Sequence, residues 1–219
     1  MAAGTSRSFD WRTWLVYTHR WLGIGGCLLF LVWFVSGVVL MYARMPSLSA
    51  EERLLRLPAL DLTRATVAPA DAAAHVGFAA TTLRVSMLHG RPVYRFNAGR
   101  DWATVYADTG AALDALSPAQ SVAIARGFAP EGSPVRHDTR LLDSDQWTLS
   151  SAIRPLMPLD RVALDDPAGT RIYVSARTGE AVLKSTRRQR VWGYLGAVMH
   201  WLYFTPLRRH LDIWVNLII

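Results

Sequence analysis

The run from Trp21 to Ala43 constrains this chain most, because its 23 residues include no Asp, Glu, Lys or Arg. A helix rises about 1.5 Å per residue, so roughly 20 apolar residues cross the ~30 Å hydrocarbon core of a bilayer. Trp14 and Tyr17 are aromatic residues of the kind that lie at a headgroup belt. The run therefore predicts a retained membrane anchor, a helix that begins near Trp11 and ends by Pro46.

Charge and cysteine content narrow the function classes. The formal net charge is +7, and its basic residues gather beside the apolar segments, which favours membrane anchoring over nucleic-acid binding. The single cysteine, Cys27, lies inside the apolar run, so one chain forms no internal disulfide and no cysteine-ligated zinc or iron–sulfur centre. The basic residues in question are Arg7, Arg12, Arg20, Lys184, Arg187, Arg188 and Arg190.

Residues 47–186 have the composition of a water-soluble domain and contain two similar stretches. Residues 91–113 and 155–183 each predict a strand, a short turn, a second strand and a Thr-Gly turn, at Thr109-Gly110 and Thr178-Gly179. Helices are predicted at 69–80 and 118–128, each with proline in its first turn. The fold class is therefore α+β, with two related units of a helix and antiparallel strands.

These residues carry a family resemblance. The segment from Pro69 through GRPVYRF and YADTG resembles a PepSY domain, a small module of one helix on an antiparallel sheet. The whole chain resembles the PepSY-associated transmembrane proteins of bacteria, a family of iron-regulated and siderophore-reductase-like membrane proteins. The matching motifs, in order, are THRWLG at 18–23, SG at 36–37, DQWTL at 145–149, YVSARTGEAV at 173–182 and GAVMHWLYFTPLR at 196–208.

The C-terminal segment, 187–219, predicts an interfacial helix over 190–205 and a second membrane span that begins near Leu211. From Leu211 to Ile219 this span has only nine residues, too few to cross a bilayer. The resemblance implies longer chains with further membrane helices, so we expect a C-terminally truncated member. The basic N-terminal tail in residues 1–46 predicts a cytoplasmic N-terminus, and the resemblance places residues 47–186 in the periplasm of a bacterial inner membrane.

The six histidines divide into two groups. His75, His89 and His137 lie in the soluble domain, and we interpret them as ordinary surface or turn residues. His19, His200 and His210 flank the membrane segments, where neutral imidazoles could hold a haem iron. His19 and His200 would lie near opposite membrane faces, so one haem cannot use both. An interfacial residue that only forms hydrogen bonds remains the alternative for both, and His210, beside two arginines, is the weakest candidate.

The resemblance implies a function for this pattern. It implies two haem b sites stacked across the membrane, one using His19 and one using His200, each completed by histidines on further helices. The expected function is electron transfer that reduces ferric iron or ferric siderophores during iron uptake; if the chain is an enzyme, it is a haem-dependent ferric reductase. The alternative is a membrane-tethered PepSY module that binds or inhibits a protease or senses a periplasmic ligand. The sequence indicates neither a catalytic constellation nor a nucleotide-binding loop.

Overall fold

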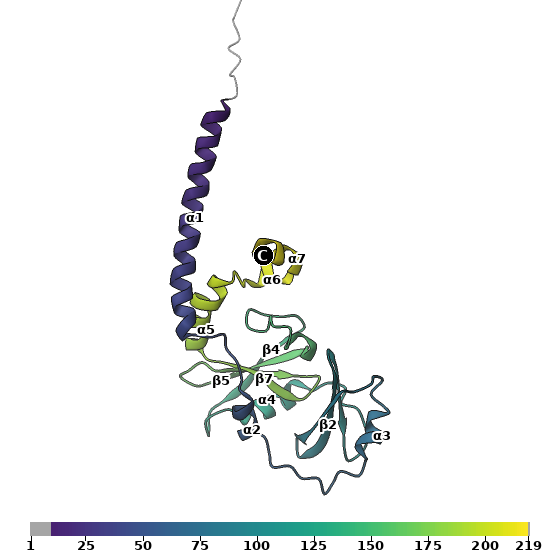
Figure 1. The fold of residues 1–219 in the computed structure, drawn as a ribbon. Coiled ribbons are helices and arrows are strands. Elements are labelled where there is room, and N and C mark those ends of the chain that lie inside the picture. Colours follow the sequence, from purple (N-terminus) through teal and green to yellow (C-terminus); the bar gives the residue numbers. More distant parts are fainter. Residues whose placement is uncertain (1–9, 219) are drawn as a thin grey trace, which may run out of the picture.

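The computed structural model describes residues 10–218, and its most prominent element is one long helix (Figure 1). Helix α1 spans Trp11–Tyr42, close to the predicted bounds. Asp10 caps it, because the Asp10 carboxylate accepts hydrogen bonds from the backbone amides of Arg12 and Thr13. Ser36 is the one side chain of α1 that is buried. By length and apolar composition, α1 could cross a membrane.

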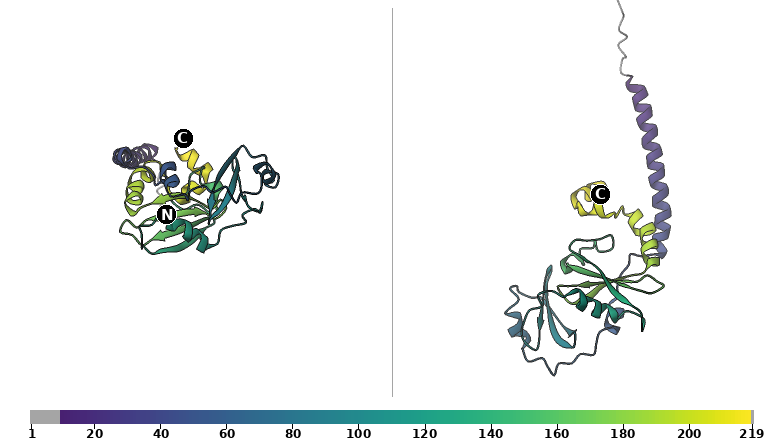
Figure 2. Two further views of the ribbon diagram at one scale, coloured as in Figure 1. Left: turned by 90° about the horizontal axis from the view of Figure 1, so that it is seen from below. Right: turned by 180° about the vertical axis from the view of Figure 1, so that it is seen from behind.

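Two small antiparallel sheets form a folded domain at one end of α1 (Figures 1 and 2). The first has the strand order β1-β2-β3 and the second β4-β5-β6-β7, so each strand pairs with the next along the chain. The two predicted strand–turn–strand segments are confirmed as β2–β3 and β5–β6. The strands are β1 (Thr82–Leu88), β2 (Arg91–Ala98), β3 (Asp101–Tyr106), β4 (Val135–Leu141), β5 (Leu159–Leu164), β6 (Arg171–Ser175) and β7 (Glu180–Ser185).

Short helices accompany the sheets. Helix α2 spans Ala50–Leu55, α3 spans Pro69–Ala73, α4 spans Pro118–Arg126 and the 3-10 helix η1 spans Arg154–Leu156. Helix α4 begins with a capping box in which Ser117 and Gln120 bond each other's backbone amides. The predicted helix over 69–80 is wrong in its length, because α3 already ends at Ala73. Gly77 then adopts a φ of +75°, and Phe78 packs on the core of the first sheet.

One core joins the two sheets. Leu88 and Val93 of the first sheet pack with Val162 and Ile172 of the second and with helix α4. Beside this core lies Arg95 of β2, whose side chain is 1% exposed. Its Nε donates to the Thr178 carbonyl at 2.6 Å and its guanidinium also reaches the Gly179 carbonyl and Ser86 Oγ. Burial lowers the pKa of Arg95, which Glu180 opposes.

The C-terminal segment differs from the single interfacial helix predicted over 190–205. Helix α5 (Arg187–Gly193) continues as a π-helix, η2 (Tyr194–Val198), and the chain then breaks around Leu202, which has a φ of +49°. Helix α6 (Thr205–Arg209) and helix α7 (Leu211–Ile218) follow, the second starting at the predicted residue. The break arises because the Tyr203 amide bonds the Val198 carbonyl, which closes a wide turn at the end of η2.

Candidate functional site

The π-helix η2 packs directly on the end of α1 that lies near the domain (Figure 1). A Cβ atom on Gly196 would lie 3.2 Å from Val39 Cγ1 and 3.3 Å from the Leu40 amide nitrogen. Ala197 and Val198, next to Gly196, are fully buried. Small residues therefore bring the two backbones close together, as at helix contacts inside membranes, and this contact fixes the position of His200 two residues later.

His200 lies against α1 through its own ring and backbone. Its Nδ1 is 3.2 Å from the Trp33 carbonyl oxygen and 3.3 Å from Ser36 Oγ, while the Trp33 indole Nε1 donates to the His200 carbonyl at 2.7 Å. A Cβ atom on Gly37 would lie 3.2 Å from His200 Cε1, so a glycine here makes room for the ring. Residues 36 and 37, the SG motif, thus contact this imidazole and leave space for its ring.

The contacts of His200 favour one of its two neutral tautomers. The Trp33 carbonyl can only accept, so its 3.2 Å contact favours the form that carries the proton on Nδ1, in which the Ser36 hydroxyl is a second neighbour. Nε2 then has a free lone pair, and it forms no hydrogen bond with any residue in 10–218. An imidazole whose Nδ1–H bonds a backbone carbonyl and whose Nε2 is free is the form that binds a metal. His200 therefore fits the role of a haem ligand.

An aromatic groove of about 580 Å³ is lined in part by Trp201, whose ring meets the His200 ring edge to face with centroids 6.4 Å apart. Trp201 and Tyr203 line it from the C-terminal segment, and the two rings meet edge to face with centroids 6.2 Å apart. Trp147 of the domain and Trp214 of α7 complete the aromatic lining. Ligand sites are typically concave, apolar and of this size, so the groove could receive a flat ring system.

His19 lies far from His200 along α1. Ser36, which touches His200, follows His19 by a rise of about 25 Å at 1.5 Å per residue. His19 is exposed and lines a shallow groove of about 490 Å³ with Gly23 and Cys27, which lie on the same helix face. A Cβ atom on Gly23 would meet nothing within 4 Å. The groove fits the approach of a flat group, with one imidazole at its edge.

Among the residues described, His210 has no contact of the kind that holds His200. It is exposed at the end of α6, and its backbone carbonyl accepts the Trp214 amide at 3.0 Å. Across residues 10–218, no group of three His, Cys, Asp or Glu side chains is arranged to hold a metal ion. The structure therefore places a single candidate imidazole at each of these positions, and a haem iron held there would need a further ligand.

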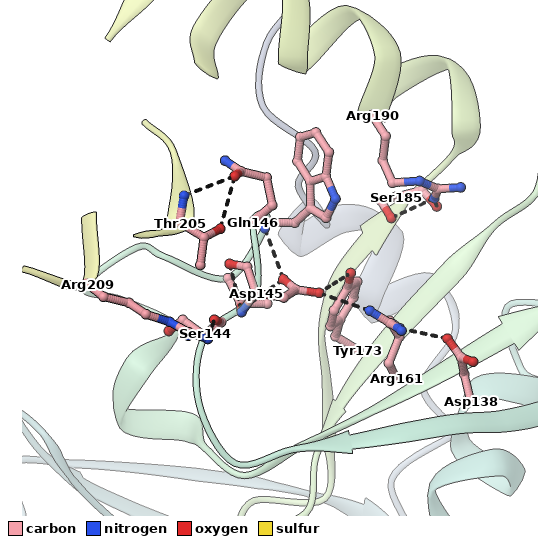
Figure 3. A network of polar contacts seen from close by, with 12 residues as sticks. Asp138, Ser144, Asp145, Gln146, Arg161, Tyr173, Ser185, Arg190, Thr205 and Arg209 are labelled. Carbon is pink, nitrogen blue, oxygen red and sulfur yellow. Dashed lines mark hydrogen bonds and ion pairs between the residues drawn. The ribbon is translucent and has the colours of Figure 1, made fainter. Parts of the chain in front are cut away.

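The loop after β4 connects the domain to this C-terminal segment (Figure 3). Gln146 Nε2 donates to the Tyr203 carbonyl at 2.6 Å, and Gln146 Oε1 accepts from the Thr205 amide and hydroxyl. Arg209 donates to the Ser144 carbonyl at 3.0 Å. These contacts hold the turn after His200 against the soluble domain.

Asp145 anchors the same loop in the second sheet (Figure 3). Its carboxylate accepts from the Tyr173 hydroxyl at 2.9 Å, from Arg161 at 3.3 Å and from the Trp147 amide at 2.9 Å. Burial and the neighbouring Asp145 charge raise the pKa of Tyr173, which stays a neutral donor. Asp145 and Gln146 begin the DQWTL motif, so this motif joins the second sheet to the C-terminal segment.

We expect Gln146→Leu, a substitution of similar size, to release the 203–209 segment from the domain. The variant leaves a carbonyl, an amide and a hydroxyl without their bonds, which costs about 1–3 kcal/mol locally. Hydrogen exchange of the α6 amides should speed up, while the amides of β5–β7 exchange as in the wild type. Gln189→Leu, which removes the capping box of α5 instead, is the matched control and should leave α6 exchange unchanged.

A second polar cluster corrects the interpretation of His137. His137 Nε2 lies 2.9 Å from Oδ1 of Asp160, a fully buried carboxylate that also accepts from Ser121 Oγ at 2.6 Å and from Arg140 at 2.8 Å. His137 is thus a partner of a buried charge and not an isolated surface residue. Ser121 bonds the carboxylate and not the imidazole, so the cluster is no nucleophile–base pair.

No family model, curated protein or solved structure matches this chain. The candidate site therefore rests on its own geometry. Of its residues, His200 and the small residues Ser36 and Gly37 were visible in the sequence, whereas Trp33 and Gln146 were missed as site residues. The sequence offered little indication of either residue. Trp33 is one aromatic residue in a long apolar run, and the role of Gln146 in the DQWTL motif becomes clear only from its hydrogen bonds with Tyr203 and Thr205.

Proposed function

We propose that this chain is a haem-binding electron-transfer protein of a bacterial inner membrane, akin to PepSY-associated transmembrane proteins. The observation that carries the proposal is His200, whose Nδ1 contacts the Trp33 carbonyl, whose Nε2 forms no hydrogen bond within residues 10–218, and whose ring meets that of Trp201, a lining residue of the aromatic groove. An imidazole that is held through Nδ1 and has Nε2 unbonded is the arrangement expected of a metal ligand.

The character of α1 supports a membrane location. Its apolar side chains are exposed almost throughout, which water would penalise and lipid would not. At its domain end, a groove of about 650 Å³ combines apolar Val38 and Met41 with Arg44, Arg188 and Trp192, the mixture typical of a headgroup region. In this arrangement the N-terminus is cytoplasmic and the α+β domain, PepSY-like in its two related units, is periplasmic.

The two imidazoles would serve two haems at different depths. His19 lies toward the cytoplasmic end of α1 and His200 toward the domain, about 25 Å apart along the helix. Haem bound at these positions supplies one-electron transfer between a cytoplasmic donor and a periplasmic acceptor. Ferric iron in an oxygen-ligand chelate is a fitting acceptor, because such hard ligands hold ferrous iron less tightly. Helices outside those described would supply the second axial ligands.

Absorption spectroscopy tests this proposal. We expect the natural gene product, purified in mild detergent, to show a Soret band and, after reduction, the sharp bands of a bis-imidazole haem b. His19→Ala and His200→Ala should each remove about half of the haem per protein, because each loses one of two sites. His75→Ala, an exposed histidine of the α+β domain, is the control and should change nothing.

A colourless, folded gene product would refute the haem proposal. The same holds if His200→Ala keeps its full haem content while His75→Ala loses it. A tethered domain that recognises a periplasmic partner would then remain as the function.

A further inference from the structure

Three arginines from three separate elements line one pocket at the edge of the domain. Arg100 comes from the β2–β3 turn, Arg154 from η1 and Arg208 from α6. The pocket has a volume of about 270 Å³, and its remaining lining residues, Leu149, Ser151 and Pro155, carry no charge. Sequence separations of about fifty residues make this meeting a product of the tertiary structure alone.

The charge of these arginines is not compensated within the part of the chain that the structure describes. None of the three forms an ion pair there. Arg208 Nε and one of its terminal nitrogens are buried and lack a hydrogen-bond partner among residues 10–218. Buried guanidinium donors are normally bonded, so Arg208 has hydrogen-bonding capacity that the described residues leave unused.

The position of Arg208 is held by its surroundings. Its guanidinium carbon lies 4.4 Å from the ring centroid of Trp214 and 4.9 Å from that of Tyr203. The next residue, Arg209, is tied to Ser144 and Asp143 of the domain (Figure 3). Stacked guanidinium groups keep their in-plane donors free for an acceptor. The site is thus preorganised on the side of α6 that faces the domain.

We propose that this pocket binds an oxyanion, a multiply charged carboxylate or phosphate group. Arginine matches both groups with paired N–H donors, and like charges placed together favour an anion between them. The volume is just below the usual range for whole ligands, so it suits a small polycarboxylate or the anionic end of a larger molecule.

Two sources offer this chemistry. One is a soluble carboxylate chelate of iron, which rests on the proposed function; the other is the phosphate of a lipid headgroup. Binding of the anion alone, without iron, is independent of haem, so failure of the pocket and failure of the haem proposal are distinguishable by measuring both the binding and the Soret band.

The test is calorimetric titration of citrate and of inorganic phosphate into the full chain in maltoside micelles at low salt. We expect saturable binding, weakened tenfold or more in Arg154→Gln and in Arg100→Gln, because each removes charged hydrogen bonds. Arg136→Gln is the charge-matched control, since the Arg136 side chain is 75% exposed and remote from the pocket lining. Both test arginines are exposed, so these variants should fold, which circular dichroism checks.

Repeating the titration in phosphatidylglycerol nanodiscs separates the sources. Citrate binding that persists there identifies a soluble anion. Binding that is lost there but kept in micelles identifies the lipid phosphate, and either result supports the pocket. Absence of citrate and phosphate binding in micelles, or equal weakening by Arg136→Gln, would overturn it.

Discussion

Asp160→Asn is expected to lower the free energy of unfolding by about 3–5 kcal/mol, the loss typical of breaking a buried charge pair. The Asp160 side chain is 0% exposed and accepts from Ser121, His137 and Arg140. Asparagine has nearly the same shape, but its amide nitrogen would face one of these donors. Denaturant unfolding of the full chain in detergent, followed by circular dichroism, measures the effect.

The pH dependence gives the same prediction an independent readout. Burial would raise the pKa of Asp160, but the hydrogen bonds from Arg140, Ser121 and His137 outweigh burial and lower it. A depressed carboxyl pKa contributes stability above the unfolded value, about 3.9, and loses it as the pH falls through the folded value. The gap between wild type and Asp160→Asn should therefore be constant near neutral pH and shrink below about pH 4.

Asp114→Asn provides the control for both measurements. Asp114 is exposed, and its side chain forms no hydrogen bond or ion pair within residues 10–218, so its replacement should change stability by no more than about 0.5 kcal/mol. An Asp160→Asn variant as stable as Asp114→Asn would show that the buried cluster does not hold β4, β5 and α4 together.

Arg95→Met is the second change with a large expected effect, again about 3–5 kcal/mol. Methionine fills similar space but leaves the Gly179 carbonyl without its donor and the Thr178 carbonyl with only the Thr104 hydroxyl at 3.4 Å. It also removes a positive charge near Glu180. Because Arg95 joins β2 to the β6–β7 turn, we expect the substitution to destabilise the first sheet more than the second. Amides of β1–β3 should exchange with solvent much faster, and those of β4–β7 only slightly faster.

Arg91→Met tests whether position on β2 alone explains this effect. Arg91 pairs with Asp108 at 2.6 Å, but its side chain is 34% exposed, and surface pairs contribute only about 0–1 kcal/mol. If Arg91→Met destabilised the first sheet as much as Arg95→Met, the link between the sheets would not depend on the buried guanidinium.

Short-range sequence patterns predicted the long helix and two of the strand pairs. The charge-free run predicted the end of α1 to within a few residues, and the aromatic residues before it predicted its start near Trp11. Strand alternation with Thr-Gly turns predicted β2–β3 and β5–β6. Gly179, in the second of these turns, has a φ of +67°, and a Cβ atom there would lie 2.9 Å from Leu88 Cδ2. Position 179 therefore requires glycine for two reasons: the positive φ of its backbone and the close approach of the Leu88 side chain.

The sequence revealed part of the candidate site. His19, His200 and His210 were candidates because each lies beside an apolar segment, which can be read directly from the sequence. The sequence did not show which of the three histidines is the strongest candidate. His200 is distinguished by the Trp33 carbonyl, by the space that Gly37 leaves for its ring and by the nearby aromatic groove. All three features depend on residues that are distant in the sequence or lie across a helix contact.

The sequence by itself thus determined that this chain has one helix able to span a membrane, an α+β domain of two related strand units, and histidines at the segment ends. Only the tertiary structure decided that His137 pairs with Asp160, that Arg95 joins the sheets, that 190–205 breaks into a π-helix and a turn, and that three arginines share a pocket. Periodicity reports the faces and ends of single elements, because these follow from neighbours a few residues apart. Partners of buried charges are chosen by how distant elements pack, and no local pattern records that choice.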